Sequence, residues 1–233
     1  MGRLFETVLL IGIILFANLT LAAEQTVTGN LLPIESTRVA YLYRDFFRVD
    51  PNIVTAFNQL GYEVEYIRES TLPKNLSIYK FVFIGDEIFL KSNLIDVSNL
   101  RTVTVNYHNI EDWGLSDRDG ASQLGSTRPL SVMQGGTEIP VYTSALLHGR
   151  VAVQYYFVDS HNTVQGFTQV ATTRTSSSGN NFGDVIFYGH PGMTLGNGKI
   201  LHQDICYFGI VKSSFWTQGA RNLFRDCVNF VAN

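Results

Sequence analysis

Polar and titratable side chains follow the apolar segments that the first half of the sequence predicts as β-strands. The candidates for a site are Arg44, Asp45, Asp86, Glu87, Asn106, His108 and Asn109. In open parallel sheets, ligands bind beyond the carboxyl ends of the strands, so these side chains would form the rim of one pocket. Asp86 or Glu87 and His108 could then act as general acid and base, or bind a divalent cation. The alternative is that these side chains only cap nearby helices and loops.

One further histidine and one tryptophan extend this candidate site. His190 follows a later apolar strand, and histidine titrates near neutral pH. We therefore predict that His108 and His190 lie at one edge of the pocket. Trp113 lies in an acidic loop beside the same edge, where its ring could stack on a sugar or simply anchor its loop to the core.

The spacing of possible ligands does not favour a metal ion. The sequence has neither an H-x-H nor an H-x-x-x-H pattern. The segment 117–120 (DRDG) lacks the regular D-x-D-x-D-G series and the distal Glu of a calcium-binding loop. We predict neither a metal site nor another cofactor.

Apolar runs and caps predict the elements that position these residues. The expected strands are 39–43, 63–67, 81–84 and 103–106. Asp50-Pro51 has the residue types of a helix N-cap and first position, and Gly61 closes that helix. A short helix is expected over 93–100. Because the strands are apolar on both faces and joined through a helix, they predict a parallel sheet, the first half of a doubly wound α/β fold.

The second half of the sequence is less regular. Residues 111–140 are rich in Gly, Ser, Asp and Thr without a helical period. Residues 150–158 and 167–172 are expected to form a hairpin or two edge strands, with His161-Asn162 in the turn between them. The later segments are expected to be a flexible loop over 173–183, a strand over 184–188, a strand or packed loop over 205–210, and an amphipathic helix over 218–231.

The order of these segments resembles the class I glutamine amidotransferase-like fold, a flavodoxin-type α/β sandwich, and in particular its ThuA-like branch. The resemblance is carried by the opening strand-helix-strand, by Phe81–Gly85, and by the Asp184–His190 ending. Phe215-Trp216 and the last helix follow as they do in ThuA-like proteins. The resemblance implies a mostly parallel sheet with an added β-hairpin region.

The amidotransferases of this family use a cysteine on a sharp turn after a central strand, and a late His-Pro-Glu element. His190-Pro191 matches the second element, but Gly192 stands in place of the glutamate. The turn after the fourth strand, Asn106 to Asn109, contains neither Cys nor Ser. Without a nucleophile, acyl-enzyme chemistry has no starting group. We therefore expect no amidotransferase activity, and an enzyme is less expected than a binding protein.

The N-terminus is typical of an exported protein. Arg3 precedes an apolar stretch over 8–21, and Ala22-Ala23 offers a small-residue cleavage point. We predict a signal peptide or anchor over 1–23, a linker over 24–37, and one α/β domain over 38–233 with an irregular and hairpin insertion at 111–183. An uncleaved N-terminal segment would be the only membrane contact.

Composition and cysteine content complete these predictions. With 17 basic and 20 acidic residues the net charge is −3, which does not favour nucleic acid as a partner. Cys206 and Cys227 form a disulfide or are two buried thiols in facing core positions.

Three functions fit the sequence. The leading one is an exported, catalytically degenerate module at the cell surface that binds a ligand, such as a carbohydrate, or an envelope protein. The others are an extracytoplasmic carbohydrate-active enzyme of the ThuA-like kind and a structural component of an envelope assembly.

Overall fold

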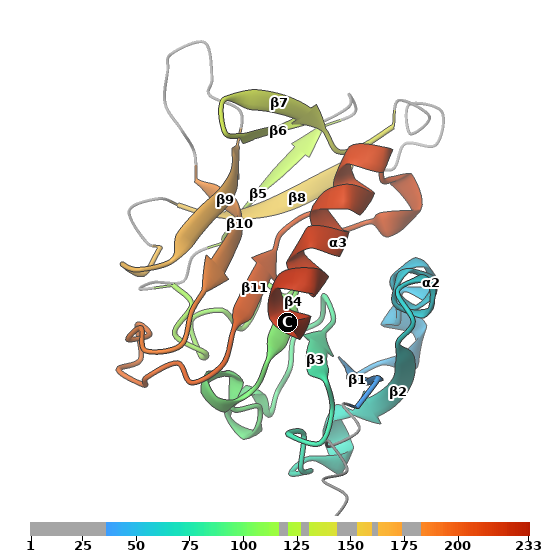
Figure 1. Ribbon diagram of the computed structural model, residues 1–233, viewed down its shortest axis with the longest axis vertical. Helices are drawn as coiled ribbons and strands as arrows, with labels where there is room; N and C mark the ends of the chain where they lie inside the picture. The colour runs from blue at the N-terminus through green and yellow to red at the C-terminus, as the bar shows by residue number, and fades with distance from the viewer. Residues whose placement is uncertain (1–35, 117–120, 127–130, 144–152, 160–162, 174–182) are drawn as a thin grey trace, which may run out of the picture. The chain divides into compact units, whose positions relative to one another are not determined.

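The computed structural model describes residues 36–116, 121–126, 131–143, 153–159, 163–173 and 183–233 (Figure 1). Several predicted features lie outside these residues: the signal or anchor, almost all of the linker, the segment 117–120, the turn at His161-Asn162, and most of the loop over 173–183. Within the described part of the chain, no helix is long and apolar enough to cross a membrane.

Five parallel strands form one half of the sheet. They are β1 (Arg38–Tyr43), β2 (Glu63–Arg68), β3 (Phe81–Ile84), β4 (Thr102–Thr104) and β11 (Ile205–Phe208). Their order is β2-β1-β3-β4-β11, and every neighbouring pair is parallel. This is the 2-1-3-4-5 strand order of flavodoxin-like folds. The predicted α/β class with a parallel sheet is thereby confirmed.

Antiparallel strands extend the sheet beyond β11. They are β5 (Ala121–Ser126), β6 (Ser131–Gln134), β7 (Thr137–Pro140), β8 (Val153–Val158), β9 (Thr168–Thr173) and β10 (Asp184–Gly189). β10 runs antiparallel to β11 and also pairs with β8 and β9. The expectation that 150–158 and 167–172 form a hairpin or two edge strands is wrong, because β8 pairs with β5 and β10, and β9 lies between β10 and β6.

The predicted irregularity of 111–140 is also wrong in part, because β5, β6 and β7 lie there. β6 and β7 form a hairpin around Gly135-Gly136, which have φ angles of 53° and 82°. Two successive residues with positive φ are what a tight hairpin turn requires, and glycine adopts them readily. The glycines that suggested a loop therefore mark the turn of a hairpin.

Two α-helices cover one face of the parallel strands. α2 (Pro51–Gln59) begins where Asp50 accepts hydrogen bonds from two backbone amides, and α3 (Gln218–Ala232) is capped by Thr217. α3 runs across β4 and β11 (Figure 1). Phe57 of α2 and Phe224 of α3 pack against Phe83, with ring centroids 5.3 and 6.3 Å from it. Both helices therefore share one aromatic core with the sheet.

The opposite face is covered by loops and short 3₁₀ helices. Alternate residues of the strands, such as Leu42 and Ile84, point into this second apolar cluster, which also contains Trp113 and Leu201. The short α-helix predicted over 93–100 is wrong: η3 (Ser92–Leu94) and η4 (Val97–Asn99) are separate single turns. Both faces are covered, but the described α-helices lie on one face only.

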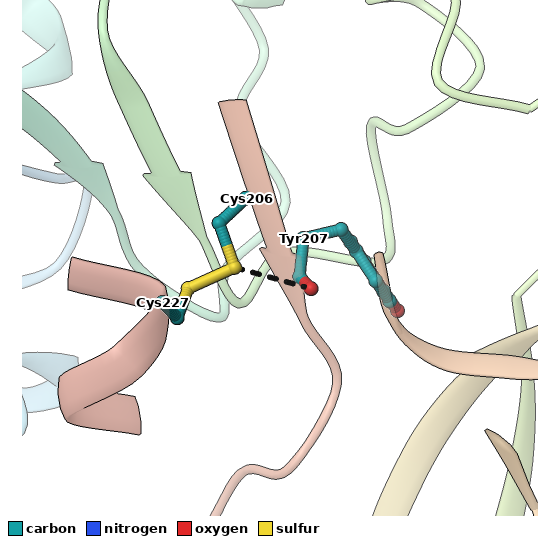
Figure 2. Close-up of a disulfide and its surroundings, with 3 residues drawn as sticks. All are labelled: Cys206, Tyr207 and Cys227. Carbon is teal, nitrogen blue, oxygen red and sulfur yellow. Dashed lines mark hydrogen bonds between the residues drawn. A yellow bond between two sulfur atoms is a disulfide. The ribbon is translucent and has the colours of Figure 1, made fainter. Parts of the chain in front are cut away.

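A disulfide joins β11 to α3, as the sequence allowed (Figure 2). The Cα atoms of Cys206 and Cys227 are 5.8 Å apart, and both side chains are fully buried. The bridge closes a loop with a sequence separation of 21. In the chain-entropy model such a closure stabilises the fold by about 3 kcal/mol.

Candidate functional site

A cavity of about 250 Å³ opens at the carboxyl ends of the parallel strands. Its walls come from segments that follow each of four strands: Arg48 and Asp50 after β1, Asp86 after β3, Val105 after β4, and Lys212 after β11. Because all four strands are parallel, these segments meet at one edge of the sheet. This is where open α/β sheets bind their ligands.

Asp86 is the acidic centre of this cavity. Its side chain is 26% exposed, and the Tyr156 hydroxyl donates a hydrogen bond to Oδ2 at 3.4 Å. The other oxygen, Oδ1, is buried and has no hydrogen-bond partner among the described residues. Burial raises the pKa of Asp86 to about 6, although Lys212, the Tyr156 hydrogen bond and Arg48 each act to lower it. Asp86 is therefore a mostly buried carboxyl group in the lining of the cavity, and one of its oxygens accepts no described hydrogen bond.

His108 lies next to this carboxyl group. Its Nε2 atom is 3.7 Å from Oδ1 of Asp86, which is beyond hydrogen-bonding distance. Burial, and then the charge of Arg48, lowers the pKa of His108 below its ordinary value. The imidazole is held by a stack of rings, with Tyr107 at 3.8 Å from His108 and 3.7 Å from Tyr156 between centroids. The predicted proximity of Asp86 and His108 is thus found, with a neutral imidazole at pH 7.

Tyr156 reaches the site from β8. Its backbone N–H donates to the carbonyl of Gly209 at 2.8 Å, directly after β11. A Cβ atom at position 209 would clash with the carbonyl oxygen of Tyr156, so glycine permits this close approach. The antiparallel part of the sheet therefore contributes the side chain that hydrogen-bonds to Asp86 of the cavity lining.

Two cations border the cavity and act on Asp86 without forming an ion pair with it. Arg48 and Lys212 are exposed, and in the described part of the chain neither forms an ion pair. Lys212 has φ 60° and ψ 54°, and no other described non-glycine residue has a positive φ. A left-handed backbone costs roughly 1–2 kcal/mol for a residue with a Cβ atom. Such strain persists where the surroundings fix it, often at functional sites.

The neighbours of Lys212 fix its backbone. The carbonyl of Val211 accepts hydrogen bonds from Tyr142 Oη at 2.5 Å and Trp216 Nε1 at 3.2 Å. On the other side, the Ser213 hydroxyl contacts both carboxylate oxygens of Asp50, at 2.7 and 2.6 Å. Lys212 is therefore held between two buried anchors with its ammonium group at the cavity.

Glu87 and its partners form a rigid support rather than a binding surface. The buried Glu87 carboxylate accepts from the backbone amides of Arg44 at 3.2 Å and Asp45 at 2.8 Å. Arg44 donates through Nη1 to the carbonyl of Ile88 at 3.0 Å, and Asp45 caps the 3₁₀ helix η1 (Phe46–Arg48). The residues after β1 are thereby tied to those after β3.

The two asparagines and the tryptophan are also occupied by backbone groups. Asn106 donates through Nδ2 to the carbonyls of Gly85 and Glu87, and it accepts from the Asn109 amide at 2.9 Å. Asn109 exchanges hydrogen bonds with both backbone groups of Phe89. Trp113 is 2% exposed and donates to the carbonyl of Ser92 at 3.1 Å. Trp113 therefore anchors its loop and is not available to stack on a sugar.

His190 lies at the opposite edge of the sheet. Because β10 is antiparallel to β11, the residue that follows β10 lies beside Asp204, which precedes β11. Nδ1 of His190 is 3.5 Å from Oδ1 of Asp204. The prediction that His108 and His190 share one edge of a pocket is therefore wrong. Within the described residues, no three His, Cys, Asp or Glu side chains gather as metal ligands.

Sequence reasoning missed three residues of the cavity lining, Arg48, Lys212 and Ser213, and also Tyr156, which contacts Asp86. A signal was present for two of them. Lys212-Ser213 follows the apolar segment 205–210, so treating that segment as another parallel strand would have placed both at the edge that holds Asp86. Tyr156 had no comparable signal, because its position depends on the pairing of β8 with strands far apart in the sequence.

Comparisons with known proteins give similarity only among solved structures. A glutamine amidotransferase from Thermotoga maritima is 11% identical, with a TM-score of 0.39 over 76% of each chain. A GMP synthase subunit from Thermoplasma acidophilum is 15% identical, with a TM-score of 0.46 over 84% of this chain and 94% of that one. PurLQS from Thermotoga maritima is 8% identical, with a TM-score of 0.44 over 83% and 98%.

No protein-family model and no curated protein matches the sequence. The three structural similarities concern the fold alone. The assignment of the fold class rests on the order and direction of the strands, and the description of the site rests on its own geometry.

Proposed function

We propose that this chain is an exported domain with an amidotransferase-like fold that binds a small sugar acid in the cavity at the carboxyl ends of β1, β3, β4 and β11. The observation that carries the proposal is the set of unpaired charges around this cavity. Arg48 and Lys212 form no ion pair among the described residues, and Asp86 lies in the same cavity lining with one long hydrogen bond, from Tyr156. Charged side chains at the opening of a cavity that form no ion pair with the protein can pair with polar and charged groups of a ligand.

Each of these groups has a matching part in a sugar acid. A carboxylate of the ligand would pair with Arg48 and Lys212 through charge-assisted hydrogen bonds. Above pH 6 the ionised Asp86 would accept hydrogen bonds from ligand hydroxyls. Phe47, at the mouth of the cavity, is 95% exposed and offers an aromatic ring to the apolar face of a sugar. In this proposal Phe47 stacks on the sugar, in place of Trp113, which the sequence had suggested.

The cysteines support a binding role outside the cytoplasm. Both cysteines of the chain are joined in the disulfide, so neither thiol is free to act as an amidotransferase nucleophile. A structural disulfide is typical of oxidising compartments, in agreement with the apolar stretch over 8–21 after Arg3. Export and ligand binding are therefore proposed together.

The experiment is a calorimetric titration of the full chain at pH 7.5 with D-galacturonate, and with D-galactose as the neutral match. We expect the acid to bind at least about tenfold more tightly, because charge-assisted hydrogen bonds contribute roughly 1.5–3 kcal/mol each. The double variant Arg48→Gln/Lys212→Asn should lose this preference, and His190→Ala should keep it. Equal affinity for both sugars, or no binding of either, would refute the proposal.

A carbohydrate-active enzyme is a second candidate, and it is favoured by the pair of Asp86 and His108. A carboxyl group with a pKa of about 6 can serve as a general acid near neutral pH. Of the catalytic residues considered from the sequence, Asp86 lines the cavity and His108 lies beside it, whereas Glu87 binds backbone amides and His190 lies at the other edge. Release of 4-nitrophenol from an aryl glucuronide, lost in Asp86→Asn, would select this function.

A further inference from the structure

A second cavity lies beside the first, in the groove between α2 and α3. Its volume is about 200 Å³. Leu60 and Phe224 supply its apolar lining, and its polar side chains come from both helices: Asn52, Gln59, Gln218, Arg221, Asn222 and Arg225. The two helices meet below it, where the rings of Phe57 and Phe224 are 5.7 Å apart between centroids.

The two cavities share part of their lining. Asn52 and Trp216 border both of them. Asn52 is the second residue of α2, and its Nδ2 atom is 3.4 Å from the hydroxyl of Ser214, a long hydrogen bond between two exposed side chains. Trp216 is fixed by its bond to the Val211 carbonyl. The boundary between the cavities therefore consists of one rigid indole and one weak surface contact.

The charged side chains that line the second groove are all cationic. It is lined by four amide side chains and two guanidinium groups, and no carboxylate belongs to its described lining. Gln218 donates to Asn222 at 3.0 Å, and Nε of Arg225 is 3.9 Å from Asp226 on the exposed side of α3. Amides both donate and accept hydrogen bonds, as sugar hydroxyls do, and guanidinium groups pair with carboxylates.

We propose that the groove between α2 and α3 is a second subsite, so that the ligand is an acidic oligosaccharide that extends from the first cavity past Asn52. One sugar acid occupies the first cavity, and the next residue lies between the amides and arginines of the two helices. This inference rests on the proposed function, because the first cavity must bind a sugar acid for the second to continue it. An acidic peptide is the competing occupant.

The test compares galacturonate with its dimer and trimer in calorimetric titrations of the full chain. We expect the trimer to bind the wild-type chain at least about tenfold more tightly than the monomer, because two further guanidinium groups are engaged. The double variant Arg221→Gln/Arg225→Gln should lose this gain and keep the affinity for the monomer. Arg101→Gln, which precedes β4 at the other edge of the sheet, is the matched control and should keep both affinities.

The outcomes separate the two proposals. A trimer that binds no more tightly than the monomer, or a double variant that weakens monomer and trimer equally, would overturn the second subsite and leave the proposed function standing. If neither monomer nor trimer binds, the proposed function itself fails. Triglutamate that binds as tightly as the trimer, with the same loss in the double variant, would identify a peptide groove and refute the saccharide.

Discussion

Asp86 and Glu87 are neighbours in the chain and lie at the same edge of the sheet, yet their carboxyl groups have opposite surroundings. Glu87 accepts hydrogen bonds from two backbone amides and is 8% exposed. Asp86 has one long hydrogen bond from Tyr156 and one buried oxygen without a described partner. The comparison separates two uses of polar residues at strand ends: Glu87 holds loops together, and Asp86 is the carboxyl group that the proposed function assigns to a ligand.

The same division applies to the other residues around the cavity. Asn106, Asn109 and Trp113 each pair with backbone groups and so belong with Glu87. Lys212 belongs with Asp86, because its ammonium has no ion pair in the described part of the chain and its backbone is strained. A residue with an unfavourable backbone conformation and a polar group without a protein partner is expected at a functional site. Three substitutions test whether this division holds.

The largest effect is expected for Glu87→Ala. It removes the charged acceptor of two part-buried hydrogen bonds, from the backbone amides of Arg44 and Asp45, so we expect the free energy of unfolding to fall by about 4 kcal/mol, at roughly 1.5–3 kcal/mol per hydrogen bond to a charged group. Urea denaturation of the variant measures the loss. Glu63→Ala, at an exposed position at the start of β2, is the control. A loss below about 1 kcal/mol would mean that Glu87 is not part of the support.

Asp86→Asn should act in the opposite direction and depend on pH. The folded-state pKa of about 6 lies above the ordinary value of 3.8, so the wild type loses stability as the pH rises from 4 through 6. The asparagine cannot ionise and escapes this loss. We expect the variant to gain up to about 3 kcal/mol over the wild type between pH 4 and pH 7.5.

Urea denaturation of both chains at these two pH values measures the gain. Asp226→Asn, which replaces an exposed carboxylate on α3, is the control measured at the same two pH values. If the difference in free energy of unfolding between Asp86→Asn and the wild type stays constant with pH, then folding does not disfavour the ionisation of Asp86.

The smallest effect on stability is expected for Lys212→Asn. Asparagine adopts the left-handed conformation more readily than lysine, so the free energy of unfolding should stay within about 1 kcal/mol of the wild type or rise. Binding of galacturonate should nevertheless fall, because one cation is lost. Lys199→Asn, in the loop between β10 and β11, should leave binding unchanged. Stability lost in parallel with binding would assign Lys212 to the support.

Local sequence signals predicted the elements that build the cavity. Asp50-Pro51 and Gly61 indicated the two ends of α2, and the apolar runs located β1, β3 and β10. The direction of β10 could not be predicted, because an apolar run is the same in parallel and antiparallel strands. That missing direction is why His190 was expected beside His108. The bonds of Glu87 and Asn106 were also hidden, since they join loops that are distant in the sequence.

The disulfide has a consequence for proteolysis. Cys206 lies before the loop that carries Lys212, and Cys227 lies after it, on α3. A protease that cuts between them, for example beside Lys212, leaves both fragments joined through sulfur. The nicked protein would keep its apparent mass on a non-reducing gel and release a short C-terminal fragment only on reduction. The domain can therefore survive a cut in the loop that carries Lys212 without losing the helix that packs against its sheet.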